Sequence, residues 1–410
     1  MAIMTVPKRL RLVATALLSV AFITYVGICV WLKLNEHKVV FARDWPPVPV
    51  RESLGLQPET VQIGNLRDVP LFAWSIRSLP EDFAANVWLL YFHGSSENVT
   101  SHQREFYRLR NLGFNVLAPE YPGYAGKPGQ PSEQAVEREA QLAFDYLHKL
   151  KNVPECNIVI WGLSIGSGVA VDLASHNRAG ALALVTPFTS LVAVGKLRYP
   201  WIPISLLASD RFESDKKISG VRAPVYIWHT VEDQVFLIEQ ARRVYELAPN
   251  PKHFEEAHGP HVSHHDYNFF VHVQQFLNAS AGYQLRSPRK PIGEVIAATL
   301  DSQSVQAALT QYRTLRAEHA NEYEFTEFDL SDLGYSELSK GNTANAIAIL
   351  KLNAEEYPKS FDMYDSLGEA YEKSGNTQAA IESFRHSVEI YPAADNYSRP
   401  KLDALLAHAK

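Results

Sequence analysis

Cysteine and net charge are both scarce in this sequence of 410 residues. Only Cys29 and Cys156 occur, so a disulfide framework is excluded. The formal net charge of −6 gives no electrostatic basis for binding nucleic acid. The length exceeds that of one ordinary domain and predicts two or three structural units.

Charged residues are also absent between Leu12 and Leu32. At about 1.5 Å per residue this run reaches about 31 Å, enough to cross one bilayer core. It is too long for the apolar part of a signal peptide, and residues 30–33 offer no small-residue cleavage site. We therefore expect an uncleaved anchor in residues 1–40. The basic residues before the run predict a cytoplasmic N-terminus and an extracytoplasmic catalytic domain, although Lys33 and Lys38 argue against that orientation.

The middle of the chain alternates apolar runs with amphipathic stretches. After a proline-rich lead-in over 41–70, we expect strands at 70–76, 86–92, 114–118, 157–161, 181–185, 224–229 and 252–256, with helices at 101–112, 132–150 and 267–277. Continuous apolar strands alternating with helices predict an α/β domain over 41–285, with a mostly parallel sheet and helices on both faces.

One turn in this domain has the pattern of a nucleophile elbow. The strand at 157–161 runs into Gly162-Leu163-Ser164-Ile165-Gly166, and small residues of helical period follow. This G-x-S-x-G pattern places a serine on a tight strand-to-helix turn, where a Cβ at either glycine would collide with neighbouring backbone. The pattern predicts Ser164 as a nucleophile and the amide of Ile165 as one donor of an oxyanion hole.

A second oxyanion donor is expected after the strand at 86–92. That strand ends in His93-Gly94-Ser95, and the corresponding turn of a hydrolase supplies a backbone amide. We expect this donor to be the amide of Ser95. By itself the string also fits a glycine turn that merely ends a strand.

An acid and a base for Ser164 are expected further along the chain. Asp233 follows the carboxyl end of the strand at 224–229, where the catalytic groups of parallel sheets gather, and Glu232 is the alternative acid. The base is expected among the four histidines of residues 258–265, namely His258, His261, His264 and His265. Spacing does not choose among them. The order serine, acid, histidine is that of the α/β-hydrolases. No cysteine or carboxylate cluster accompanies the histidines, so we expect no metal.

These stretches together resemble the α/β-hydrolase superfamily over residues 70–278. The sequence is most similar to its membrane-anchored branch, which includes thioesterases that remove palmitate from proteins and lipases that act on lysophospholipids. The matching stretches are His93-Gly94, the run 121–133, GLSIG, PFTSL, Asp210-Arg211-Phe212 and Glu232-Asp233. In that branch the base commonly stands in the string H-N-D. The resemblance therefore implies His264 as base, with His265 in the asparagine place. That departure leaves His265 and His261 as alternatives.

Residues 192–212 are apolar and aromatic without a strand pattern. They fit either a small cap that receives an acyl chain or a helix that only covers the sheet.

The last third of the chain repeats with a period of 34 residues. Leu333-Gly334, Gly341, Ala346, Leu350 and Pro358 recur as Leu367-Gly368, Gly375, Ala380, Phe384 and Pro392. This is the tetratricopeptide period and predicts helical hairpins over 327–360 and 361–394 within an all-helical domain at 290–410. Helices at 292–317 and 401–409 are expected to cap them. Such repeats either bind a peptide or protein partner or serve as a packing module.

The sequence thus predicts a membrane-anchored serine hydrolase that cleaves esters or thioesters without a cofactor. The anchor and the apolar segment favour a lipid or an acylated protein as substrate, but a short-chain ester would fit the same residues. Two alternatives stay open: an acyltransferase with the same triad, and a non-catalytic anchored scaffold whose repeats are the working part.

Overall fold

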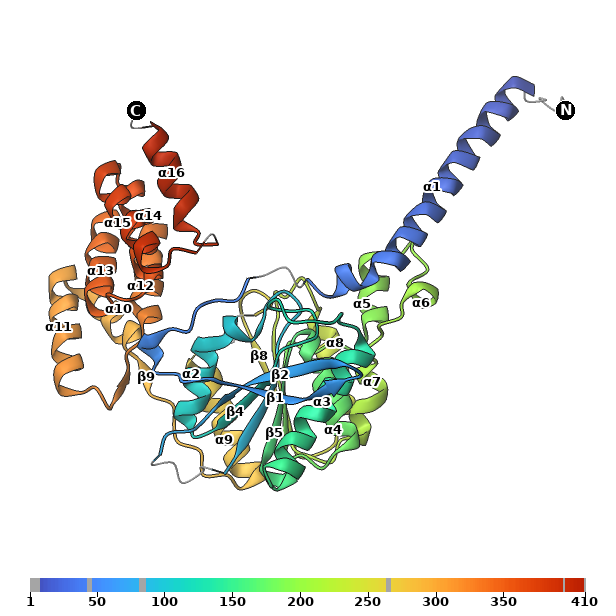
Figure 1. Cartoon of the computed structure of the whole chain (residues 1–410), viewed down its shortest axis with the longest axis horizontal. Coiled ribbons are helices and arrows are strands. Elements are labelled where there is room, and N and C mark those ends of the chain that lie inside the picture. Colours follow the sequence, from blue (N-terminus) through green and yellow to red (C-terminus); the bar gives the residue numbers. More distant parts are fainter. Residues whose placement is uncertain (1–7, 43–45, 81–85, 263–266, 394, 409–410) are drawn as a thin grey trace.

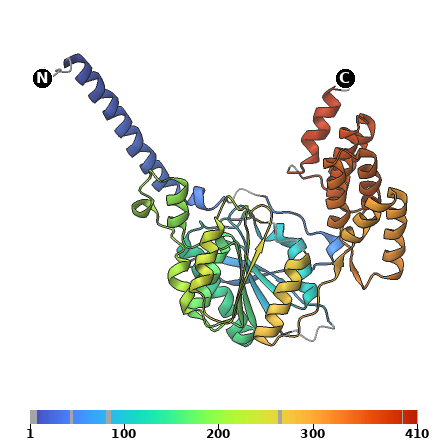
Figure 2. The same ribbon diagram turned by 180° about the vertical axis from the view of Figure 1, so that it is seen from behind.

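The computed structural model describes residues 8–42, 46–80, 86–262, 267–393 and 395–408. Three parts follow one another along the chain (Figure 1): a long N-terminal helix, a sheet domain and a C-terminal helical domain. Figure 2 shows the same arrangement from behind.

The N-terminal helix α1 spans Lys8–Val40 without interruption. Its stretch Leu12–Val40 has a mean hydropathy of 2.2 in its most apolar window and is long enough to cross a membrane. The helix therefore extends beyond the predicted span of 12–32. The residue after the helix, Phe41, is 1% exposed and belongs to the core of the sheet domain.

An eight-stranded sheet forms the centre of the molecule, in the order β1-β2-β4-β3-β5-β6-β7-β8. The strands are β1 (Glu59–Leu66), β2 (Val69–Ile76), β3 (Trp88–Phe92), β4 (Asn115–Pro119), β5 (Ile158–Leu163), β6 (Ala181–Val185), β7 (Val225–Thr230) and β8 (Lys252–Ala257). Pairing is antiparallel for β1–β2 and β2–β4 and parallel from β4 to β8. The predicted mostly parallel sheet is confirmed.

Helices cover both faces of the sheet. One face packs on α3 (Glu133–Asp145), α4 (Ile165–His176) and α8 (Ile238–Leu247), and the other on α2 (Gln103–Leu112) and α9 (Tyr267–Ala281). Because both faces are buried, the strands β3, β5 and β6 are apolar throughout. Along β3, for example, Leu90 and Phe92 enter one core while Leu89 and Tyr91 enter the other.

Three short helices follow β6: α5 (Leu191–Arg198), α6 (Ile204–Leu207) and α7 (Ser214–Lys217). We call residues 191–212, which include α5 and α6, the cap. Cap and α1 lie side by side in both views (Figures 1 and 2).

The C-terminal domain contains two helical hairpins, α12 (Glu327–Ser339) with α13 (Thr343–Glu356) and α14 (Phe361–Lys373) with α15 (Thr377–Ile390). The repeated glycines sit where the helices of each pair touch. A Cβ on Gly334 would lie 2.5 Å from the Leu350 side chain, and one on Gly368 would lie 2.6 Å from Phe384. The predicted 34-residue repeat therefore places equivalent contacts in equivalent hairpins.

The flanking helices differ from the prediction. Residues 292–317 form two helices, α10 (Ile292–Ser302) and α11 (Val305–Glu318), rather than one. The chain turns at Ser304, whose hydroxyl accepts a hydrogen bond from the amide of Ala307 as an N-cap. The last helix, α16, spans Ser398–His408 and begins three residues before the predicted start. Short strands β9 (Lys290–Pro291) and β10 (Tyr323–Glu324) pair beside the first of these helices.

Arginines of the sheet domain join it to the repeats. Arg108 contacts Glu324 at 2.8 Å in a pair that is only 5% exposed on either side. Arg51 contacts Glu327 at 2.9 Å and also pairs with Asp362. The ring of Phe328 lies between two guanidinium groups, those of Arg51 and Arg104, each about 5 Å from its centre. The two domains therefore share a polar, largely buried interface.

Candidate active site

The elbow is formed by the end of β5 and the start of α4. Ser164, between them, has φ 53° and ψ −122°, a conformation that L-residues rarely adopt. Its amide donates to the carbonyl of Val185 on β6 at 2.9 Å, which fixes the turn to the sheet. A Cβ on Gly162 would lie 2.4 Å from the Gly166 carbonyl, and a Cβ on Gly166 would lie 2.2 Å from the Phe92 carbonyl. Both glycines are therefore required by contact with backbone.

Asp233 lies past the end of β7 and is 2% exposed. Its Oδ1 accepts hydrogen bonds from the amides of Val235 at 2.7 Å and Phe236 at 3.0 Å. Burial alone would raise the pKa of Asp233, but hydrogen bonds from His261 and from these amides outweigh it and lower the pKa. The carboxylate is thus charged and fixed in orientation.

His261 links this carboxylate to the serine. Its Nδ1 lies 2.6 Å from Asp233 Oδ2, and its Nε2 lies 2.8 Å from Ser164 Oγ. A carboxylate only accepts, so Nδ1 carries the proton and the bare Nε2 accepts from the serine hydroxyl. The ring also meets the edge of Phe236, with centroids 5.2 Å apart. The arrangement is therefore set up for proton transfer from Ser164 to His261.

Of the other three histidines in residues 258–265, the structure describes His258. His264, the base implied by the resemblance, and its neighbour His265 lie outside the described residues. His258 is on the surface, with Nδ1 2.7 Å from Glu232 Oε1, and Glu232 also accepts from the amide of Gly259 at 2.9 Å. Glu232, the alternative acid, thus holds the loop that leads to His261, while Asp233 contacts the imidazole.

The expected oxyanion donors both border the serine. Ser95, Ser164 and Ile165 line one cavity of about 260 Å³. Ile165 is the first residue of α4, where an amide has no acceptor within its own helix and lies at the positive end of the helix dipole. A Cβ on Gly94 would lie 3.6 Å from the Ser164 Cβ, so the turn carrying Ser95 runs directly past the nucleophile.

Sequence reasoning missed two tyrosines that hold this turn. Tyr121 donates its hydroxyl to the carbonyl of His93 at 3.0 Å, and Tyr124 donates to the carbonyl of Ser95 at 2.8 Å. Both are buried, and the Tyr121 ring lies 4.0 Å from the His93 ring. His93 itself is buried, and its Nδ1 donates to Gly94 O at 2.8 Å. The string YPGY after β4 was the available signal.

A further missed residue is His229, the penultimate residue of β7. It is fully buried, its Nδ1 donates to Thr230 O at 2.9 Å, and its Nε2 lies 3.6 Å from Asp233 Oδ2. Burial lowers the pKa of His229 and keeps this ring neutral behind the carboxylate. Its spacing of four residues from Asp233 was the only signal in the sequence.

The cavity above the serine is mostly apolar. Its walls come from the cap (Leu191, Val194, Gly195, Arg198, Tyr199, Ile204, Leu207, Ala208 and Asp210), from α1 (Leu32, Lys33, Glu36, Val39 and Val40) and from the loop after β7 (Val235 and Phe236). Of the two interpretations of residues 192–212, the cavity fits a cap over the site. Among the described residues no group of three or more His, Cys, Asp or Glu side chains is placed to hold a metal ion.

Comparison with known proteins finds relatives that are similar in sequence to more than half or about half of this chain. An uncharacterized protein of Mycobacterium tuberculosis is 29% identical over 259 residues, which are 63% of this chain and 90% of that protein. The lysophosphatidylserine lipase ABHD12 of Danio rerio is 27% identical over 225 residues, 48% of this chain and 58% of the lipase. The sheet domain has the α/β-hydrolase fold and ABHD12-like relatives.

Two further comparisons found a repeat family in the C-terminal domain and a solved structure similar to part of the chain. A tetratricopeptide repeat model matches residues 361–393, the second predicted hairpin. A Pyrococcus furiosus esterase superposes with a TM-score of 0.46 at 16% identity, covering 58% of this chain and all of the esterase. The chain spans only about half the length of its ABHD12-type relatives, in contrast to the mycobacterial protein.

Proposed function

We propose that this α/β-hydrolase is a serine hydrolase that cleaves carboxylic esters or thioesters through an acyl-enzyme. The observation that carries the proposal is the hydrogen-bonded series Asp233–His261–Ser164, with 2.6 and 2.8 Å between successive atoms, at the tip of the elbow. Nucleophile, base and orienting acid stand in the positions that acyl transfer needs. The cavity lining supports an apolar acyl group.

The reaction follows from these positions. His261 Nε2 takes the hydroxyl proton as Ser164 Oγ bonds to the acyl carbon, and the negative charge on the carbonyl oxygen is held by the amides of Ser95 and Ile165. The bond to the leaving alcohol or thiol then breaks, and that group takes the proton from His261. Water attacks the acyl-enzyme in the same way and releases the carboxylic acid and free Ser164. No step requires a metal or a redox cofactor.

The test uses the full chain in detergent micelles with a fluorophosphonate probe and p-nitrophenyl butyrate. Ser164→Ala should abolish labelling and lower kcat by about 10⁴-fold or more. His261→Ala should behave similarly, whereas His258→Ala, on the same loop but paired with exposed Glu232, should retain activity.

His264→Ala and His265→Ala decide the base. Full activity in both supports His261, and loss of labelling in either one with labelling intact in His261→Ala would return the assignment to that histidine. A folded wild-type chain that neither labels nor cleaves the ester would refute the hydrolase and favour an anchored scaffold.

We also propose that α1 crosses the membrane with its N-terminus in the cytoplasm, because Lys8 and Arg9 precede the apolar stretch. Cys156 is a free and exposed thiol on the sheet domain and reports the orientation. A membrane-impermeant maleimide should label intact cells through Cys156 and should not label the Cys156→Ser variant. Labelling that appears only after lysis would reverse the topology.

A further inference from the structure

The last turns of α1 pack along the cap. Half-buried positions recur at Tyr25, Cys29, Leu32, Glu36 and Val40, a spacing of three to four residues that marks one face of the helix. Apart from Asn35 and His37, which are also half-buried, the other described residues of the apolar stretch are exposed, as at Leu34, which is 70% exposed. One stripe of the anchor is thus reserved for contact with its own enzyme domain.

Polar contacts fix this stripe to the cap. Glu36 accepts hydrogen bonds from the amides of Ser209 at 2.6 Å and Asp210 at 3.0 Å. Lys33 donates to the carbonyl of Leu207 at 2.7 Å and to the hydroxyl of Ser209. Tyr25 donates to the carbonyl of Trp201 at 2.9 Å. The anchor therefore contacts both the tip of the cap, at Trp201, and the returning segment of the cap, residues 209–212.

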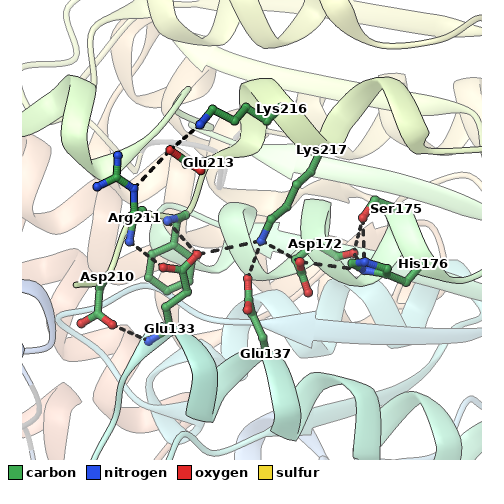
Figure 3. Close-up of polar contacts among 11 residues, drawn as sticks. Glu133, Glu137, Asp172, Ser175, His176, Asp210, Arg211, Glu213, Lys216 and Lys217 are labelled. Atoms are coloured by element: carbon green, nitrogen blue, oxygen red, sulfur yellow. Dashed lines mark hydrogen bonds and ion pairs between the residues drawn. The ribbon is translucent and has the colours of Figure 1, made fainter. Parts of the chain in front are cut away.

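The other side of the returning segment is held by α3 (Figure 3). Asp210 accepts from the amide of Glu133 at 2.8 Å, while the Glu133 carboxylate accepts from the amides of Arg211 at 2.5 Å and Phe212 at 2.9 Å. Phe212 is buried against Gly168 of the elbow helix, where a Cβ would lie 2.9 Å from its ring. Movement of the cap is thus restrained between the anchor and the elbow.

Lys217 forms a cluster of ion pairs next to Glu133. It pairs with Glu137 and Asp172, each at 2.7 Å, and lies 3.9 Å from Glu133 (Figure 3). The cluster joins three helices. These are α7, which follows the cap, α3, which holds the returning segment, and α4, which begins directly after Ser164.

The cap surface near the anchor is apolar and exposed. Leu197, Trp201 and Leu206 are 61%, 57% and 84% exposed, and Trp31 on α1 is 57% exposed. Because Tyr25 within the apolar stretch bonds the backbone of Trp201, the tip of the cap lies at the depth of the anchor's apolar residues. Exposed tryptophan and leucine at that depth suit the boundary of a bilayer rather than water.

From these contacts we propose that α1 forms one wall of the acyl-binding cavity, and that the chain of a long-chain ester or thioester enters from the leaflet beside it. The inference rests on the proposed function. The apolar part of the wall from the anchor consists of Leu32, Val39 and Val40. The part from the cap includes Val194 of α5 and Leu207 of α6, and Ser164 also lines the cavity. The anchor is then a specificity-determining part of the enzyme and more than a tether.

The experiment compares p-nitrophenyl butyrate with the laurate and palmitate esters on the full chain in nanodiscs. Val39→Trp fills the proposed wall from the anchor, Val194→Trp fills it from the cap, and Leu34→Trp is the matched control on the exposed face of the same helix. Val39→Trp and Val194→Trp should each lower kcat/KM for the long esters by about tenfold or more, as expected if tryptophan displaces about two methylene groups. Leu34→Trp should change the hydrolysis of all three esters and fluorophosphonate labelling by less than about twofold.

The outcomes separate the two proposals. If wild type cleaves butyrate but Val39→Trp and Leu34→Trp have the same chain-length profile, α1 is not a wall of the cavity. If Val194→Trp alone shifts the profile, the acyl site belongs to the cap and the inference about the anchor fails. If wild type cleaves no ester, the proposed function itself fails. Val39→Trp that does not fold is replaced by Leu32→Trp, read in the same way.

Discussion

Replacing Arg51 by methionine should destabilise the junction between the repeats and the hydrolase domain. Arg51 is 17% exposed in its side chain and pairs with Glu327 and Asp362, which are 0% and 11% exposed. Methionine keeps much of the side chain's apolar length but leaves two carboxylates without a cation. Breaking a buried ion pair in this way typically costs about 3–5 kcal/mol. Because Arg51 keeps some exposure, we expect about 3 kcal/mol, or a fall of about 10 °C or more in the first unfolding transition.

The stability loss caused by Arg51→Met should depend on pH. Burial raises the pKa of Asp362 to about 6 even though Arg51 lowers it. A raised folded-state pKa contributes stability that is fully present below the unfolded value of about 3.9 and is lost as the pH rises through the folded value. Removing Arg51 raises that pKa further. The loss caused by Arg51→Met should therefore be larger at about pH 8 than at about pH 5.

The assay is thermal unfolding of the full chain in detergent, followed by far-UV circular dichroism at both pH values. Lys359→Ala is the matched control, because Lys359 pairs with Glu52 at 2.9 Å but both side chains are more than 70% exposed. That exposed pair should contribute less than about 1 kcal/mol. Equal losses for the two variants, or a loss from Arg51→Met that does not depend on pH, would refute the reasoning.

Three other outcomes are expected. Gly166→Ala should cost more than about 4 kcal/mol and yield little folded protein, whereas Gly220→Ala, whose Cβ would meet nothing closer than 3.8 Å, should express normally. Asp233→Asn should lower kcat for p-nitrophenyl butyrate by about 10⁴-fold with an unchanged melting temperature, because an amide no longer selects the Nδ1–H tautomer of the base. Burial opposes the charge of His102, but neighbouring carboxylates raise its pKa to about 9. Stability from this group should therefore fall between about pH 6.5 and 9, and Glu97→Gln should flatten that slope in melting curves.

The sheet could be predicted because its central strands are buried on both faces. Runs such as 86–92 and 181–185 are almost entirely apolar and are too short for helices, so they are predicted as buried strands. The helices between such runs have clear apolar stripes. The edge strand β1 was missed and assigned to the lead-in. Only Ile63 among its residues is buried, so its sequence lacks the apolar run that identified the others.

The places of Ser164 and Asp233 in the fold were predictable because each has a local signal, the G-x-S-x-G turn for Ser164 and a strand end before Asp233. The histidine that contacts them had no such signal. Four histidines within eight residues are equivalent by spacing, and the path of the loop places His261 against both partners. Glu232 directs that path by holding His258 and Gly259, a contact between segments that are far apart in sequence. The preferred His264 came from a family string, not from geometry.

The cap illustrates a different limit. Apolar residues of the cap line the cavity, contact the anchor or lie on the exposed surface near the anchor. Composition alone does not show which residue has which of these surroundings. The role of Glu36 was likewise invisible, since a glutamate just past an apolar span ordinarily marks only the return to water. Its hydrogen bonds to the backbone of residues 209 and 210 become apparent only when the helix and the cap are placed together.

The anchor continues as one helix from Lys8 to Val40, and the next residue, Phe41, is held in the core of the hydrolase domain. A rod joined in this way to a globular body acts as a lever, since there is no slack joint between them. In a thicker or thinner bilayer a membrane-spanning α1 would tilt to match its apolar length, and Ser164 would change its height above the lipid by the same rotation. Bilayer thickness would then set the distance between Ser164 and the lipid surface.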